Sequence, residues 1–283
     1  MDSIPNVQWF PGHMAKTRRL MKEQLPLVDA VVELADARVS MSSRNPELDD
    51  LVGMKPRIVL LNKCDLADEN ATARRLRELT QEGAFSLAVD CRSGKGLAGF
   101  QPLVKRVLRE YITRNEEKGM AGKPLRLMVV GIPNTGKSSF INRMAGKNRA
   151  KVADRPGVTR HNNWFNIGQG IELLDTPGVL WPKFEDPIVG LRLAFIGSIK
   201  DEILDITEIA AAFLSVVKTE YADRLTERYR ITDFSDCESW EVLEQIARKR
   251  GMLISGGEAD LERASVMLLD EYRAGKLGRI SLD

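Results

Sequence analysis

A glycine-rich segment of the chain has the residue types and spacing of a phosphate-binding loop. Residues 131–138 read GIPNTGKS and directly follow the apolar run at residues 125–130. Glycines let backbone N–H groups turn toward phosphate oxygens, and the start of a following helix adds its dipole. We therefore expect the Lys137 ammonium to neutralise the β- and γ-phosphates of a nucleotide and the Ser138 hydroxyl to bind Mg²⁺; a glycine-rich turn without a ligand is the alternative. The residues expected around the phosphates are Asn134, Thr135, Gly136, Lys137, Ser138 and Ser139.

A second motif, Asn62-Lys63-Cys64-Asp65, follows the apolar run at residues 57–61. It therefore stands at the carboxyl end of a predicted strand, where open α/β sheets bind ligands. The Asp65 carboxylate can accept hydrogen bonds from N1–H and N2–H₂ of guanine, a pair of donors that adenine lacks, so it would select GTP over ATP. We expect Asn62 to brace the neighbouring loop and the stem of Lys63 to lie against the base. The residues expected at guanine O6 are Cys91, Arg92 and Ser93, which follow the apolar run at residues 85–89.

A D-x-x-G pattern begins at Asp175, after the apolar run at residues 171–174. In a nucleotide site Asp175 would hold Mg²⁺ through water, and the N–H of Gly178 would meet the γ-phosphate. Thr159, between this pattern and the phosphate loop, is the candidate for the second hydroxyl on Mg²⁺. A threonine on the surface of a loop is the alternative interpretation of Thr159.

Two positions bear on how the nucleotide would be hydrolysed. Val179 stands directly after the D-x-x-G pattern, where many GTPases carry a Gln that orients the attacking water. An apolar side chain cannot do this. The side-chain carbonyl of Asn134 is a suitable ligand for K⁺, which would add positive charge near the transferred phosphoryl group. An Asn selected for its turn geometry is the alternative.

Short apolar runs alternate with amphipathic stretches over the first two thirds of the chain. This pattern is typical of β-α units and predicts an α/β fold with a mostly parallel sheet. The last two runs are separated by Gly168-Gln169-Gly170 and predict a hairpin. The predicted strands are residues 30–34, 57–61, 85–89, 125–130, 164–167 and 171–174. A basic helix is predicted before them at residues 14–25, and helices are predicted between them at residues 68–80 and 97–113.

The chain changes character near residue 205. Strand patterns end there, and helical patterns follow at residues 206–217, 221–229, 239–250 and 259–272. We therefore predict a nucleotide-binding domain at residues 1–204 and a small all-helical domain at residues 205–283.

The order of the motifs is itself informative. In ordinary GTPases the phosphate loop comes before N-K-x-D, whereas here Asn62 precedes Gly131. A circular permutation preserves the site in space while moving the chain ends to other surface loops. The sequence therefore predicts a circularly permuted P-loop GTPase domain.

The motifs together resemble those of a known family, the circularly permuted GTPases of the ribosome biogenesis GTPase A group. The resemblance covers essentially the whole chain. It implies a GTPase of low activity that binds a late precursor of the large ribosomal subunit and is stimulated by it. The segments that carry it are WFPGHM (residues 9–14), DAR (residues 36–38), SSRNP (residues 42–46), NKCD, GIPNTGKSS, GVTR and DTPGVLWPKFED (residues 175–186).

The resemblance also implies roles for single residues. In a family with a hydrophobic residue at position 179, His13 is the proposed group that orients the water, and an imidazole can accept a hydrogen bond from water near neutral pH. A structural role of His13 in fixing the N-terminal segment is the alternative. The family's helical C-terminal domain contacts ribosomal RNA, which here would use basic faces such as Arg248-Lys249-Arg250.

The distribution of charge along the chain predicts two regions with different binding partners. Residues 206–283 carry 11 basic and 15 acidic side chains, whereas the preceding residues carry 31 and 25. Basic side chains near the predicted moving parts favour contact with RNA phosphates over a merely solvated face. They are Lys16, Arg18, Arg19, Lys22, Lys147, Arg149, Lys151, Arg155 and Arg160.

The composition of the chain indicates the cellular compartment in which the protein acts. The three cysteines have no C-x-x-C spacing, which argues against a disulfide framework or a structural zinc site and for a reducing compartment. The start of the chain lacks a basic flank before an apolar stretch, and the apolar run at residues 209–217 is too short for a membrane span. We expect a cytoplasmic protein, monomeric off the ribosome, with no membrane or DNA partner.

Two other functions stay open at this point. One is a GTP-dependent RNA-binding switch that does not act on the ribosome, and the other is a P-loop phosphotransferase. A phosphotransferase would need a small-molecule acceptor and would not require N-K-x-D.

Overall fold

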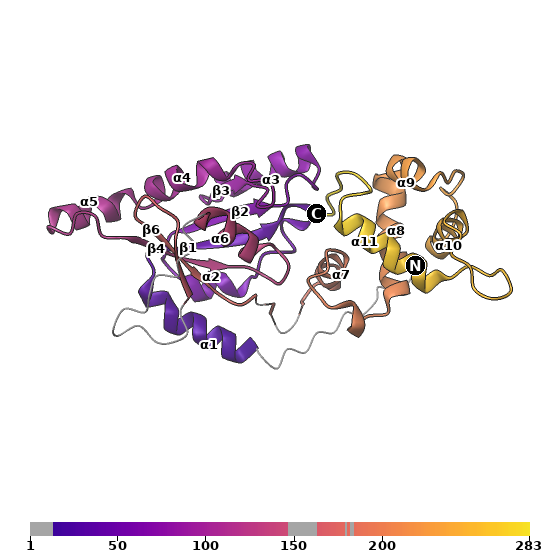
Figure 1. The fold of residues 1–283 in the computed structure, drawn as a ribbon, viewed down its shortest axis with the longest axis horizontal. Coiled ribbons are helices and arrows are strands. Elements are labelled where there is room, and N and C mark those ends of the chain that lie inside the picture. Colours follow the sequence, from indigo (N-terminus) through magenta and orange to yellow (C-terminus); the bar gives the residue numbers. More distant parts are fainter. Residues whose placement is uncertain (1–13, 147–162, 179, 182–183) are drawn as a thin grey trace. The chain divides into compact units, whose positions relative to one another are not determined.

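The computed structural model describes residues 14–146, 163–178, 180–181 and 184–283. Contacts divide the described chain into two compact units, one that ends at Trp181 and one that begins at Phe184. Figure 1 labels the helices and strands of the two units.

The first unit is built on a six-stranded sheet with the order β3-β2-β1-β4-β6-β5. All neighbouring strands are parallel except β5 and β6. The predicted α/β fold with a mostly parallel sheet is therefore confirmed. The strands are β1 (Ala30–Asp36), β2 (Arg57–Asn62), β3 (Phe85–Ala88), β4 (Leu125–Val130), β5 (Asn163–Asn166) and β6 (Ile171–Asp175).

The antiparallel pair at the sheet edge is the hairpin that the sequence predicts. Gly168, Gln169 and Gly170 all have positive φ, at 86°, 52° and 75°. Glycine adopts this left-handed region at little cost, so two glycines in three residues allow the chain to reverse here. The N–H of Ile171 closes the turn by donating to the carbonyl of Gly168 at 3.0 Å.

Helices cover both faces of the sheet, and the alternation along β1 separates the two faces. Val32 and Leu34 pack in a cluster with Phe100 of α4 and Phe140 of α6, whose rings meet edge to face with centroids 5.0 Å apart. Val31 packs on the opposite face, in a cluster with residues of α1 and α2. The helices of this unit are α1 (Met14–Gln24), η1 (Leu25–Leu27), η2 (Ala37–Val39), α2 (Glu47–Val52), α3 (Glu69–Gln81), η3 (Leu97–Gly99), α4 (Phe100–Val107), α5 (Arg109–Glu117) and α6 (Lys137–Ala145).

The helix predicted over residues 97–113 is divided in the structure. A 3₁₀ turn, α4 and α5 follow one another, and α4 ends at Val107 because the ψ of the next residue, Leu108, is 17° and lies outside the helical range. The N–H of Leu108 still donates to the carbonyl of Val104, and the N–H of Ile112 donates to that of Leu108. The hydrogen-bond ladder thus continues through the break.

The second unit is helical, with α7 (Pro187–Phe195) packed on α8 and with α8, α10 and α11 in mutual contact. Its core includes three aromatic rings in contact: the Phe213 ring centroid lies 4.7 Å from that of Tyr272 and 5.4 Å from that of Phe195. The predicted C-terminal helical region is confirmed, and α7 belongs to the same compact unit. Its other helices are η4 (Asp201–Ile203), α8 (Ile206–Glu220), α9 (Ala222–Tyr229), α10 (Ser239–Lys249) and α11 (Leu261–Arg273).

A helix that crosses a bilayer needs about 20 mostly apolar residues. Within the described residues, none combines the length and the apolar character that crossing a membrane requires.

Candidate nucleotide site

A pocket of about 780 Å³ lies in the first unit, where the strands β4 and β6 end. These strands are parallel neighbours, with Val129 opposite Asp175, so the loops that follow them begin side by side. This is the edge of the sheet where α/β proteins bind ligands. Of the residues predicted to form the site, the pocket is lined by Lys63, Asn134, Gly136, Lys137, Ser138, Ser139, Asp175 and Gly178.

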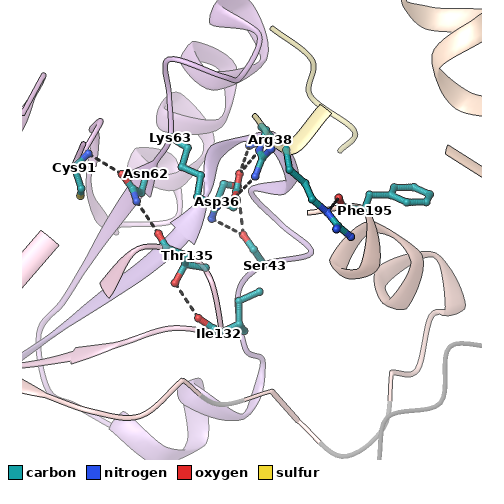
Figure 2. A network of polar contacts seen from close by, with 10 residues as sticks. Asp36, Arg38, Ser43, Asn62, Lys63, Cys91, Ile132, Thr135 and Phe195 are labelled. Carbon is teal, nitrogen blue, oxygen red and sulfur yellow. Dashed lines mark hydrogen bonds and ion pairs between the residues drawn. The ribbon is translucent and has the colours of Figure 1, made fainter. Parts of the chain in front are cut away.

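The phosphate-loop segment is closed by bonds within itself. The ammonium of Lys137 donates to the carbonyl oxygens of Gly131 at 2.9 Å and Ile132 at 2.8 Å. The hydroxyl of Thr135 donates to the carbonyl of Ile132 at 3.0 Å (Figure 2). The loop thus keeps its conformation through hydrogen bonds to its own carbonyls. The Thr135 side chain is fully buried, so its hydroxyl stabilises the loop.

Two glycines of the loop are required by close approach of other groups. A Cβ on Gly131 would lie 2.5 Å from the carbonyl oxygen of Leu34, and one on Gly136 would lie 2.4 Å from Nδ2 of Asn62. Gly136 also has a φ of 95°, which side-chain-bearing residues rarely adopt. The glycine spacing in the sequence therefore reflects both turn geometry and packing against β1 and the N-K-x-D segment.

Burial perturbs both charged groups at the phosphate end. Burial lowers the pKa of Lys137 to about 8, although the nearby Asp175 carboxylate opposes the shift. Burial raises the pKa of Asp175, with Lys137 acting in the opposite direction. A Cβ on Gly178 would lie 2.9 Å from Nζ of Lys137, so the Gly178 backbone lies against the ammonium. A desolvated ammonium beside a carboxylate and a backbone segment is suited to receive a phosphate group.

Asn62 joins the phosphate loop to the loop expected at the guanine base. Its Nδ2 donates to the carbonyl of Thr135 at 2.6 Å, and its Oδ1 accepts from the N–H of Cys91 at 2.9 Å (Figure 2). The side chain is buried at the end of β2. One amide thus ties together segments that lie 29 and 73 residues away in sequence.

The segment of Cys91, Arg92 and Ser93 is held by the preceding residue. The Asp90 carboxylate accepts from the N–H of Arg92 at 2.8 Å and of Ser93 at 3.1 Å. The guanidinium of Arg143 on α6 donates to the carbonyl of Arg92. Burial raises the pKa of the Cys91 thiol to about 12, so this cysteine is an uncharged structural group at neutral pH.

Other predicted site residues lie outside the pocket lining or outside the described chain. Asn62, Asp65, Thr135 and the segment at residues 91–93 do not line the pocket. His13, Thr159 and Val179 lie outside the described residues.

The structure adds residues that the motifs did not indicate. Leu20 and Gln24 of α1 line the pocket, as do Asn163 of β5 and Thr176. Thr176 also donates from its hydroxyl to the carbonyl of Val129 at 2.6 Å, which ties the D-x-x-G segment to β4. The amphipathic pattern of residues 14–25 predicts a helix but carries no sign of its position beside the phosphate loop.

Comparisons with known proteins agree with this geometry. Residues 126–246 match the model of a family described as 50S ribosome-binding GTPase. The chain is 43% identical over 277 residues to ribosome biogenesis GTPase A of Bacillus cereus, covering 98% of this chain and 93% of the relative. Two solved chains, described as GDP-bound TM YlqF and GNP-bound YlqF from T. maritima, are each 29% identical to it. Their TM-scores are 0.66 and 0.64, covering 94% and 95% of this chain and 98% and 97% of theirs.

Proposed function

The chain belongs to the ribosome biogenesis GTPase A family and is a GTPase that acts in assembly of the large ribosomal subunit, and we propose that its nucleotide binds in the pocket described above. The observation that carries the proposal is the gathering of Lys137, Ser138 and Asp175 around one pocket. Residues from two motifs that are distant in sequence meet there, as binding of a nucleoside triphosphate requires.

We assign the phosphates of GTP and GDP to the loop formed by Asn134, Thr135, Gly136, Lys137, Ser138 and Ser139. Lys137 replaces its bonds to the carbonyls of Gly131 and Ile132 with stronger, charge-assisted bonds to phosphate oxygens. The backbone N–H of Gly178 meets the γ-phosphate. The relatives with solved structures are described as bound to GDP and to GNP, which supports a guanine nucleotide here.

The guanine base is assigned to the N-K-x-D segment and to residues 91–93. Asp65 accepts from N1–H and N2–H₂ of guanine, Lys63 lies against the base, and the loop of Cys91, Arg92 and Ser93 contacts O6. The support for this assignment is the Asn62 amide, which fixes both loops to each other and to the phosphate loop.

The oxygen atoms at the phosphate end suit Mg²⁺. Ser138 and Asp175 line the same pocket and offer a hydroxyl and a carboxylate, which are hard ligands of the kind that Mg²⁺ takes together with nucleotide phosphates. We propose that Ser138, Thr159 and Asp175 hold the ion, which supplies charge neutralisation for the phosphoryl group. Asn134, also in the pocket lining, is proposed to bind K⁺ by its side-chain carbonyl, and His13 to orient the attacking water.

The partner is a precursor of the large ribosomal subunit together with its RNA. We propose that the helical region, including residues 205–283, contacts this RNA through exposed basic residues such as Arg248, Lys249 and Arg250. The protein is proposed to act in the cytoplasm and to be monomeric off the ribosome.

The test is GTP hydrolysis by the purified protein, in K⁺ and in Na⁺, with and without large ribosomal subunits. The chain has two histidines, which provide a matched pair of variants, His13→Ala and His161→Ala. We expect subunits and K⁺ to stimulate the wild type and the His161→Ala variant. In His13→Ala the stimulation should be lost, with GTP affinity retained.

Each component of the proposal has its own contrary result. Stimulation retained by His13→Ala would remove that residue from the chemistry. Equal rates in K⁺ and Na⁺, or an unchanged K⁺ effect in Asn134→Ala, would remove the K⁺ assignment. Subunits that neither bind the protein nor stimulate it would argue against a ribosomal partner for this chain.

A further inference from the structure

A buried carboxylate lies beside the N-K-x-D segment. Asp36, the last residue of β1, is fully buried and stands opposite Asn62, the last residue of β2. Its carboxylate is 2.9 Å from the ammonium of Lys63, and Figure 2 shows the two side chains reaching toward each other. The same carboxylate accepts from Nε of Arg38 at 2.9 Å and from its Nη2 at 2.8 Å.

Lys63 combines an unusual backbone with a place in the pocket wall. Its φ is 60°, in the left-handed region that a residue with a side chain adopts only when its surroundings hold it there. Its side chain is 25% exposed, and it lines the nucleotide pocket. The ammonium of this side chain is therefore held by Asp36, while another part of the residue lines the pocket.

Asp36 is itself held on several sides. The hydroxyl of Ser43 accepts from the N–H of Asp36 at 2.9 Å and donates to its carbonyl at 3.3 Å. The N–H of Arg38 donates to the carboxylate at 3.1 Å. Burial raises the pKa of Asp36, but the Arg38 guanidinium and the Lys63 ammonium outweigh burial and keep the pKa below its usual value. The DAR and SSRNP segments thus meet around one ionised carboxylate.

A carboxylate with a purely structural role would not need a second cation beside it. The fork of Arg38 already supplies two hydrogen bonds and a full opposite charge, which satisfies a buried carboxylate. Glu33, on the same strand, shows the structural case: it is buried and paired with Arg44 at 3.2 Å and Arg57 at 3.7 Å, and neither arginine lines the nucleotide pocket. The second cation on Asp36 differs because it comes from the ligand site.

We propose that Asp36 is a positioning residue for guanine-nucleotide binding, which holds the Lys63 side chain as a preformed wall of the base site. A free lysine side chain loses rotamer freedom when it becomes part of a binding surface, and this loss weakens binding. Here the loss has already occurred on folding, because the ammonium is held by a carboxylate that is itself fixed by Arg38 and Ser43. The inference rests on the proposed function, in which Lys63 lies against the guanine base.

The test is a double-mutant cycle on full-length protein, with the dissociation constant of fluorescent GDP as the readout. Asp36→Asn keeps the size of the side chain but removes its charge, and Lys63→Met keeps the stem but removes the ammonium. We expect each variant to bind GDP about tenfold more weakly. The double variant should be no weaker than Lys63→Met, because both changes release the same side chain.

Matched controls separate positioning from folding. Glu33→Gln removes a buried, doubly paired carboxylate from the same strand, so it should lower the midpoint of urea unfolding and leave GDP affinity within about twofold. Should Asp36→Asn fail to fold, Asp36→Glu takes its place, since the charge is kept but displaced by one methylene. It should still weaken GDP binding while Arg38 remains paired.

The outcomes distinguish this inference from the proposed function. If the wild type does not prefer GDP to ADP, or keeps that preference in Asp65→Ala, the proposed guanine site fails. If the preference holds and depends on Asp65, while the folded Asp36 variants or Lys63→Met bind GDP as the wild type does, only the positioning role is overturned. Additive effects in the double variant would also overturn it.

Discussion

In the nucleotide pocket the buried ammonium of Lys137 donates to two backbone carbonyls, whereas in the helical unit the carboxylate of Glu271 meets two guanidinium groups and a phenol. The partners of Glu271 are Arg228, Arg250 and the Tyr229 hydroxyl, the last at 2.9 Å. Arg228 holds the pKa of Glu271 below its usual value against the effect of burial. Burial instead prevails at Lys137 and lowers its pKa to about 8.

The Glu271 carboxylate therefore stabilises the fold, whereas the Lys137 ammonium can gain stronger interactions from a bound ligand. Glu271 is matched by full charges within its own unit, so its interactions stabilise the native state directly. Lys137 meets neutral carbonyls and a nearby carboxylate whose own pKa is raised, so an incoming phosphate can form stronger bonds than those it replaces.

Removal of the Lys137 charge should abolish function without harming the fold. In Lys137→Met we expect the single-turnover rate of GTP hydrolysis to fall by about 10³-fold, because a charge directed at the transferred phosphoryl group is lost. The free energy of unfolding in urea should stay the same or rise, since a desolvated ammonium is removed. A clear loss of stability would show that its bonds to the loop carbonyls serve the fold after all.

For an arginine of the helical unit we expect a loss of stability without a loss of nucleotide binding. Arg273 donates to the carbonyls of Ala194 and Phe195 and forms a two-pronged ion pair with Asp201. In Arg273→Ala the free energy of unfolding should fall by about 3 kcal/mol, because several partly buried acceptors lose their donor. GDP affinity should change by less than about twofold. The control is Arg263→Ala, at an exposed position of the same helix, which should leave the urea midpoint unchanged.

Removal of the Asn62 amide should weaken ligand binding more than it destabilises the fold. Asn62→Ala removes two hydrogen bonds, to the Thr135 carbonyl and from the Cys91 N–H. Without them the loops must be ordered when GDP binds, and a cost of about 1 kcal/mol for each lost bond predicts roughly 30-fold weaker GDP binding by titration calorimetry. Asn142→Ala, at an exposed position of α6, is the control and should bind GDP as the wild type does. Equal affinities in both variants would mean that the loops hold their positions without the Asn62 amide.

The smallest effect expected is a pH dependence of GDP affinity. The pKa of Lys137 is lowered to about 8 in the free protein, and bound phosphate favours the protonated ammonium and raises that pKa. Binding therefore takes up a proton above pH 8, so affinity should fall by up to about tenfold per pH unit there. In Lys137→Arg, whose guanidinium does not titrate in this range, the slope should vanish. A flat profile in the wild type would contradict the lowered pKa.

The features that depend on local residue pattern could be predicted from the amino-acid sequence. Alternating apolar runs indicated the six strands found within the described residues and the hairpin at Gly168-Gln169-Gly170, since strand burial and turn conformation depend on a few neighbouring residues. Motif spacing identified the loop at residues 131–138 and the permuted order. The boundary after residue 204 and the roles of His13 and Thr159 stay predictions.

The tertiary structure alone decided how separate segments meet. Nothing in the sequence pattern places Asp36 against Lys63, or the Asn62 amide between Thr135 and Cys91, because these contacts depend on the order of strands in the sheet. The lowered pKa of Lys137 likewise needs the burial that only packing supplies. The chemistry of each residue type is local, but its protonation state and its partner depend on which parts of the chain fold against it.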